Sequence, residues 1–267
     1  MINFHSEDNR STYSSRDADL TWENKIQDIC DVKGKKVLDI GCGGGIYSKA
    51  LAGMGAAAVT GLDFSEQQLS SARENCKGYS NIDFNLGNAL DTKLGTGQYD
   101  IVLERAVIHH IKDLDTCFKE ISRLLKPAGI CLIQDRTPED CLLEGSSTHI
   151  RGFFFSKYPE LINKETSRRY TSEKVYKVLG DAGFTDSKEY KLWETRESYN
   201  GIDDLVKDIV NRTGRSILYE LSDKEIEDLE GYIKGQLDHK DNEPIVEKDR
   251  WTIWKAVHQK GIRGFDG

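Results

Sequence analysis

A glycine-rich turn between a short apolar strand and a helix constrains the fold of this chain more than any other feature. Residues 36–40 form a β-rich apolar run, and four of the five residues at 41–45 are glycines. The pattern then predicts a helix over residues 46–54. Glycine has no Cβ, so the backbone of such a turn can approach a ligand closely. The turn therefore favours an α/β fold with a ligand site at its glycines.

Strands and helices alternate from residue 36 to residue 135, which predicts a parallel sheet with helices on both faces. In such sheets, ligands bind beyond the carboxyl ends of the strands. After the first strand, the pattern predicts strands at 57–63, 82–86, 99–103 and 130–134, and helices at 65–76 and 114–125. Ser65 and Gln68 are spaced as a capping box at the start of one of these helices.

Beyond residue 140 the pattern predicts further helices and two late strands. The helices fall at 172–179, 202–210 and 222–237, and the strands at 184–193 and 251–257. Ser222 and Glu225 form a second capping-box pattern. We expect the helices of 201–238 to be inserted between the two late strands of the same sheet. Residues 153–155, all phenylalanine, are interpreted either as core or as an apolar lid.

Composition narrows the classes of partner. The chain has 267 residues and a formal net charge of −8, which argues against general binding to nucleic acids or membrane surfaces, both polyanions. No apolar run approaches the roughly 18 residues that span a bilayer. The N-terminus shows no signal-peptide pattern. The six cysteines show no CxxC, so we expect no disulfide framework, no metal site and a cytoplasmic location.

Asp63 ends the second predicted strand and is the second candidate ligand contact. A carboxylate at this position can accept both hydroxyls of a ribose. The alternative, that Asp63 caps the next helix, is disfavoured because Ser65 is better placed for capping. Phe64 follows, and it is interpreted either as a stacking partner for an aromatic base or as core.

At this point the motifs resemble those of class I S-adenosylmethionine (SAM)-dependent methyltransferases. Residues 37–45 (VLDIGCGGG) look like the first motif of that family, and 61–65 (GLDFS) like the second. The third- and fourth-strand motifs and the turn before strand five are matched by 87–90 (GNAL), 99–103 (YDIVL) and 124–129 (LLKPAG). The five motifs occur in order with family-like spacing, and the match is specific over residues 36–135.

The resemblance implies a Rossmann-like three-layer sandwich with a seven-stranded, mostly parallel sheet whose last strand is antiparallel. The expected divisions are an N-terminal helical or lid segment (1–30), a SAM-binding core (31–195 and 246–260) and a helical insertion (196–245) that is a candidate substrate cap. The implied activity is transfer of a methyl group from SAM, leaving S-adenosylhomocysteine, to an unidentified small-molecule acceptor by in-line displacement.

The resemblance also assigns roles to individual residues. Gly41, Cys42 and Gly43 would lie against the methionine part of SAM, and Asp63 and Phe64 would bind the ribose and the adenine. Glu104 would offer its backbone carbonyl to the methionine ammonium, and Ala89 its backbone amide to the adenine ring. Asn88 would face the adenine amino group. The family usually has Asp at that position, and the Asn oxygen can still accept a hydrogen bond.

Two residues of the N-terminal stretch are further cofactor candidates. In relatives with such a stretch, an Arg or Tyr folds over the cofactor. Tyr13 and Arg16 are therefore candidate lid residues, with Arg16 pairing with the carboxylate of SAM. A solvated surface position for Arg16 is the alternative.

His109 and His110 follow the fourth strand and are the candidate catalytic residues. An unperturbed histidine titrates near neutral pH, so either could act as a general base if the acceptor must lose a proton. The alternative is that one of them packs against or caps the next helix. Residues 135–137 should line the acceptor side, where Arg136 could bind an anionic substrate or pair with a neighbouring acid.

Two other classes of function stay open at the level of sequence. One is a non-catalytic SAM-binding or interaction protein that keeps the fold. The other is a nicotinamide-dependent oxidoreductase, which is disfavoured because Ile46 occupies the third glycine position of the dinucleotide motif.

Overall fold

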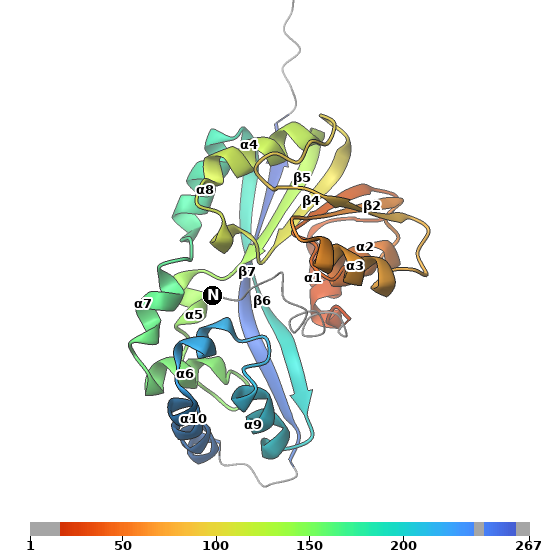
Figure 1. The fold of residues 1–267 in the computed structure, drawn as a ribbon. Helices are drawn as coiled ribbons and strands as arrows, with labels where there is room; N and C mark the ends of the chain where they lie inside the picture. Colours follow the sequence, from red (N-terminus) through yellow and green to blue (C-terminus); the bar gives the residue numbers. More distant parts are fainter. Residues whose placement is uncertain (1–16, 238–242, 260–267) are drawn as a thin grey trace, which may run out of the picture.

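The computed structural model describes residues 17–237 and 243–259, and within them seven strands form one sheet (Figure 1). The strands are β1 (Lys36–Ile40), β2 (Ala58–Asp63), β3 (Ile82–Leu86), β4 (Tyr99–Arg105), β5 (Leu125–Asp135), β6 (Phe184–Tyr199) and β7 (Ile245–His258). Their order is β3-β2-β1-β4-β5-β7-β6. Only β7, among these described strands, runs antiparallel to its neighbours. The predicted fold class is therefore confirmed.

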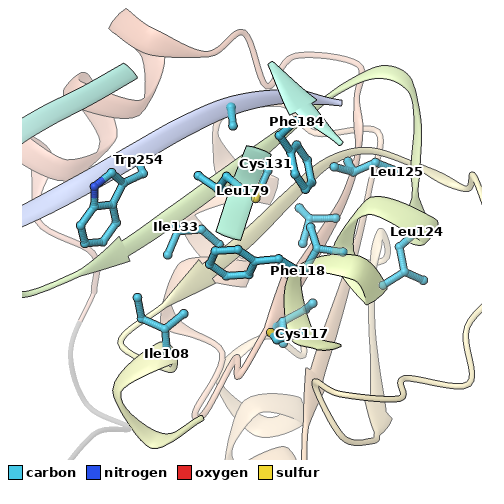
Figure 2. Close-up of a cluster of buried hydrophobic side chains, with 14 of the residues drawn as sticks. Ile108, Cys117, Phe118, Leu124, Leu125, Cys131, Ile133, Leu179, Phe184 and Trp254 are labelled. Carbon is cyan, nitrogen blue, oxygen red and sulfur yellow. The ribbon is translucent and has the colours of Figure 1, made fainter. Parts of the chain in front are cut away.

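Helices cover both faces of the sheet, which gives three layers (Figure 1). On one face lie α1 (Leu20–Ile29), α2 (Ile46–Gly53) and α3 (Glu66–Asn75), and on the other α4 (Leu114–Leu124) and α8 (Ser172–Asp181). Trp22 of α1 is fully buried in the first layer. On the opposite face, Phe118 of α4 packs in one cluster with Ile133 of β5 and Trp254 of β7 (Figure 2).

The periodicity of α4 explains its place in the core. Its buried residues recur three and four positions apart, so they line one side of the helix. They are Leu114, Cys117, Phe118, Glu120, Ile121 and Leu124. Asp113 caps the helix by accepting a hydrogen bond from the Thr116 amide at 3.0 Å. The helix ends at Leu124, one residue before the predicted end, but β5 begins at Leu125, five residues before the predicted start at Ile130.

The two late strands are longer than the sequence predicted. β6 continues to Tyr199 instead of Trp193, and β7 begins at Ile245 instead of Trp251. Their added residues are rich in charges, and these charges are held in ion pairs within the two strands and with neighbouring elements. Arg196 Nη1, for example, lies 3.0 Å from Glu247 Oε2. Alternating apolar residues therefore do not mark these ends of β6 and β7, because paired charges occupy positions where apolar side chains were expected.

The extended ends of β6 and β7 carry a second helical layer (Figure 1). Its members are α5 (Pro138–Cys141), α6 (Arg151–Lys157), α7 (Leu161–Thr166), α9 (Ile202–Val210), the 3₁₀ helix η3 (Ser216–Glu220) and α10 (Asp223–Gln236). The capping box of Ser222 and Glu225 begins α10 as predicted. The phenylalanines at 153–155 are buried among these helices, so they are core.

The predicted insertion thus lies between the last two strands, as α9, η3 and α10. All six cysteines are buried and free. Among the residues that the structure describes, no helix is both long and apolar enough to cross a membrane.

Candidate active site

The glycine loop at the carboxyl end of β1 has left-handed backbone at three positions. The φ angles of Gly41, Gly43 and Gly45 are 71°, 51° and 81°. A Cβ on Gly41 would lie 2.2 Å from Val107 Cγ2, so close packing requires glycine there. A Cβ on Gly43 would have Gln68 Oε1, at 3.8 Å, as its nearest neighbour among the described residues. Packing within the chain therefore constrains Gly41, whereas Gly43 keeps its Cβ position clear.

Asp63, at the end of β2, holds this loop through its carboxylate. Its Oδ2 accepts a hydrogen bond from the Gly43 amide at 3.0 Å, and its Oδ1 accepts one from the Ser65 amide at 2.9 Å. Ser65 itself caps α3, so the helix-capping alternative for Asp63 is wrong. An ionised carboxylate can accept about four hydrogen bonds, so Asp63 can hold the loop and also receive ribose hydroxyls.

Phe64 and Asn88 follow the ends of β2 and β3, which are neighbours in the sheet. The Phe64 residue is 59% exposed, which excludes the alternative that it is core. Leu86, also 59% exposed, pairs with Asp63 and adds apolar surface beside it. Asn88 Oδ1 accepts a hydrogen bond from the Leu90 amide at 2.9 Å, and an amide oxygen can accept a second one. Ala89, which follows Asn88 in the chain, is half-buried.

Glu104 lies on β4 beside Ile40 of β1, one residue before the glycine loop. Its side chain is fully buried, and the Cys117 thiol donates a hydrogen bond to Glu104 Oε1 at 3.4 Å. Burial, aided by the charge of Asp135 and opposed by the thiol contact, raises the pKa of the Glu104 carboxyl to about 8. The side chain therefore belongs to the core, so the predicted cofactor contact would have to use the backbone.

His109 lies in a short 3₁₀ helix, η2 (Ile108–His110), just after β4. Its Nδ1 is 2.7 Å from Asp135 Oδ2, and its backbone amide donates to the same oxygen at 3.3 Å. Asp135 ends β5, the neighbour of β4, so the two strand ends bring these side chains together. An ionised Asp135 fixes the proton on Nδ1 and leaves Nε2 as a lone-pair acceptor.

The pKa shifts of this pair keep the imidazole neutral and the carboxylate charged. Burial lowers the pKa of His109, although Asp135 opposes that effect. Burial alone would raise the pKa of Asp135, but His109 and Arg169 hold it well below its ordinary range. The pair therefore has the protonation state of a general base and its orienting acid at neutral pH.

His110 has a different environment from His109. Its side chain is exposed, and its ring lies 3.9 Å from the His109 ring, centroid to centroid. Partial burial and the neighbouring His109 lower its pKa to about 4. The structure thus pairs a carboxylate with His109, a distinction that the sequence did not provide.

Arg169 and Arg105 were missed in the sequence, and Arg136, which was expected to bind a substrate or a neighbouring acid, instead pairs with the distant Asp249 at 2.5 Å. Arg169, which follows α7, places Nη1 2.7 Å from Asp135 Oδ1. Arg105 at the end of β4 stacks on Trp251 of β7 at 4.5 Å, and Arg136 stacks on the same ring at 4.2 Å. These contacts join distant segments, and no local motif marks them. Tyr13 and Arg16 lie outside the described residues.

Comparison with known proteins supports the resemblance to methyltransferases that the sequence motifs indicated. A family model described as "Methyltransferase domain" matches residues 31–183, which is more than half of the chain. The chain belongs to the methyltransferase domain family. The resemblance to class I SAM-dependent methyltransferases is thereby confirmed, as is SAM as the cofactor of the family.

Curated relatives include enzymes of two named kinds. The chain is 32% identical over 200 residues to a ubiquinone biosynthesis O-methyltransferase of Psychrobacter arcticus, covering 69% of this chain and 70% of that one. It is 40% identical over 112 residues to the enzyme of that name from Thiobacillus denitrificans, covering 41% and 47%. A demethylmenaquinone methyltransferase of Bacillus licheniformis is 34% identical over 116 residues, covering 42% and 50%. The matched region thus spans about half the length of the Thiobacillus denitrificans and Bacillus licheniformis enzymes.

Solved structures share the fold at low identity. Phosphoethanolamine N-methyltransferase 2 of Haemonchus contortus, in complex with phosphomonomethylethanolamine and S-adenosylhomocysteine, gives a TM-score of 0.60 at 20% identity. The alignment covers 97% of this chain and 61% of that one. The YcgJ protein of Bacillus subtilis gives 0.57 at 19% identity, covering 90% and 99%. These likenesses support the sheet topology described above.

Proposed function

We propose that this chain transfers a methyl group from SAM to a hydroxyl oxygen of a small molecule, with His109 as the general base. The 2.7 Å contact between His109 Nδ1 and Asp135 Oδ2 carries this proposal. A base is useful only where the acceptor must lose a proton, so the pair favours an oxygen acceptor. The O-methyltransferases among the relatives support the same choice.

The residues at the glycine loop fit the adenosyl part of SAM. Among the described parts of the chain, the nearest atom to the Cβ position of Gly43 is Gln68 Oε1 at 3.8 Å, so backbone and ligand can approach closely there. The Asp63 carboxylate lies beside the loop and suits two ribose hydroxyls. Phe64 offers an exposed ring to adenine, while Asn88 and Ala89 offer polar groups to its edge. Gly41, Cys42 and the backbone of Glu104 would border the methionine part.

The chemistry left to the protein is positioning and proton transfer. SAM, when bound, supplies a methyl group that its sulfonium already activates. His109 Nε2 would take the hydroxyl proton, and Asp135 would stabilise the resulting imidazolium and fix the ring orientation. Orientation of the acceptor oxygen supplies most of the remaining rate enhancement.

We propose a phenolic hydroxyl in particular. A phenol has a pKa of about 10, far closer to that of imidazole than an alcohol has. Because burial lowers the pKa of His109, this base is weak and suits only a comparatively acidic hydroxyl.

The helices at the far end of β6 and β7 are proposed to cap the acceptor side. The proposed cap comprises α9, η3 and α10, whereas residues 196–199 and 245, which were predicted as part of the insertion, belong to β6 and β7. Insertions on a constant scaffold commonly carry specificity, which supports this division.

Separate substitutions of the two histidines test the proposal with catechol as the acceptor. We expect His109→Ala to lower kcat about 100- to 10,000-fold, the usual contribution of a general base. His110→Ala should stay within a few-fold of wild type, because a pKa lowered to about 4 makes His110 a poor acceptor of the hydroxyl proton. Mass spectrometry of the product measures the rate. Equal rates in the two variants would exclude His109 as the base, and no methyl transfer to catechol or to its carboxylate derivative protocatechuate would favour the non-catalytic alternative.

A further inference from the structure

Four arginines form a cluster with buried carboxylates, and one of them, Arg169, pairs with Asp135 beside the candidate base. This arginine cluster consists of Arg136, Arg151, Arg168 and Arg169. It is tied by ion pairs to three carboxylates, those of Asp135, Glu165 and Asp249. With His109 neutral, the cluster has one more positive than negative charge, although the chain as a whole carries −8.

The cluster also lacks hydrogen-bond acceptors. The Nε atoms of Arg136, Arg151 and Arg168 are buried and have no partner among the described residues. A buried donor without an acceptor is costly, because it has lost its water. Burial lowers the pKa of Arg136, and Arg151 and Arg169 lower it further against the opposing Asp249. An anion bound at the cluster would therefore offset its excess positive charge and reduce the repulsion between the arginines.

Arg168 and Arg169 lie close to the candidate base, and Arg136 lies close enough to Arg169 for the two charges to repel. Arg168 keeps 29% of its side chain exposed, and it is near enough to lower the pKa of both His109 and His110. Arg136 directly follows Asp135 and stacks 4.2 Å from the Trp251 ring. Arg169 joins the cluster to the base, since it shares the Asp135 carboxylate with His109.

We propose that the acceptor carries an anionic oxygen group, a carboxylate or a phosphate-type group, in addition to its hydroxyl, and that Arg168 and Arg136 bind it. The inference rests on the proposed function and names its substrate class. A guanidinium matches both oxyanions through paired N–H donors. A neutral analogue would leave these donors without an acceptor, so the site should discriminate strongly against it.

The test compares three catechols that differ only in one substituent. Protocatechuate carries a carboxylate, its phosphonate analogue carries the phosphate-type group, and its primary amide is neutral. Each is titrated calorimetrically into the protein saturated with S-adenosylhomocysteine, and each is assayed for methyl transfer from SAM. The proteins are wild type, Arg168→Gln and Arg136→Gln. Arg73→Gln removes an exposed charge on α3, away from the cluster, and is the matched control.

We expect at least one anionic catechol to bind wild type and the Arg73→Gln control about tenfold to a hundredfold more tightly than the amide. In Arg168→Gln or Arg136→Gln this ratio should fall towards one, while the amide affinity changes little. The stronger anion identifies the group.

Equal affinities of the acids and the amide in wild type would overturn the inference, as would an unchanged ratio in both cluster variants. If the amide is methylated as efficiently as the acids, the proposed function survives and the inference fails. If the anionic catechols bind selectively but none is methylated, the inference survives and the proposed function fails.

Discussion

Replacing Asp135 with Asn tests how the carboxylate controls the candidate base. The negative charge of Asp135 favours protonated His109, so its removal should lower the pKa of His109. A buried hydrogen bond to a charged group contributes about 1.5–3 kcal/mol, and this one is 2.7 Å long between side chains that are 10% and 1% exposed. At about 1.4 kcal/mol per pKa unit, the pKa should fall by roughly one to two.

The pH dependence of kcat is the assay, measured with catechol from about pH 5 to about pH 9. Activity is lost on acidification as the base becomes protonated, so a lower pKa moves this acidic limb to lower pH by roughly one to two units. The plateau should lie between those of wild type and His109→Ala, because a less basic imidazole is a weaker catalyst.

Asp140→Asn is the matched control for this prediction. Asp140 is also a fully buried carboxylate paired with an arginine, Arg250, at 2.6 Å. Its loss should lower stability but leave the acidic limb in place. If the limb of Asp135→Asn stays at the wild-type pH, or if the control moves it equally, the coupling of Asp135 to His109 is refuted.

Three further substitutions separate stability from binding. Gly41→Ala should destabilise the fold severely, because its Cβ meets Val107 at 2.2 Å, and Val107→Ala in the same chain should restore part of the stability in urea denaturation. Gly43→Ala should cost only about 1–2 kcal/mol of stability for its left-handed backbone, yet weaken S-adenosylhomocysteine binding in calorimetry more than that cost explains; an unchanged affinity would contradict the loop assignment. The pKa of Glu104 is raised to about 8 in the folded protein, so the protonated carboxyl stabilises the fold at low pH. This stabilisation is lost as pH rises from 4.5 through 8. The stability of Glu104→Gln relative to wild type should therefore increase with pH. A slope near 1.4 kcal/mol per pH unit within that window is expected, and a flat difference would contradict a raised pKa.

The geometry of the proposed cofactor site could be predicted from sequence because its parts are local. Gly41 and Gly43 follow one strand directly, and Asp63 ends the next. Parallel strands place their carboxyl ends at one edge, and the structure brings the Gly43 amide within 3.0 Å of Asp63 Oδ2. The capping box of Ser222 and Glu225 was predictable for the same reason.

The acceptor half could not be predicted, since its contacts join segments far apart in the chain. The sequence offered two histidines, and only the meeting of β4 and β5 shows that Asp135 faces His109. Arg169 reaches the same carboxylate across 34 positions. The ends of β6 and β7 escaped prediction because ion pairs, such as that of Arg196 with Glu247, replace apolar side chains in their buried faces.

Calorimetric titration with S-adenosylhomocysteine tests most directly whether the glycine loop and the neighbouring aspartate bind the cofactor. Asp63→Ala should weaken binding at least tenfold, since hydrogen bonds to charged groups contribute about 1.5–3 kcal/mol. Asp83→Ala, an exposed aspartate on β3, should bind as wild type does. Circular dichroism would verify that each variant is folded. Wild-type affinity in Asp63→Ala, or no binding heat in the wild-type protein, would contradict the account.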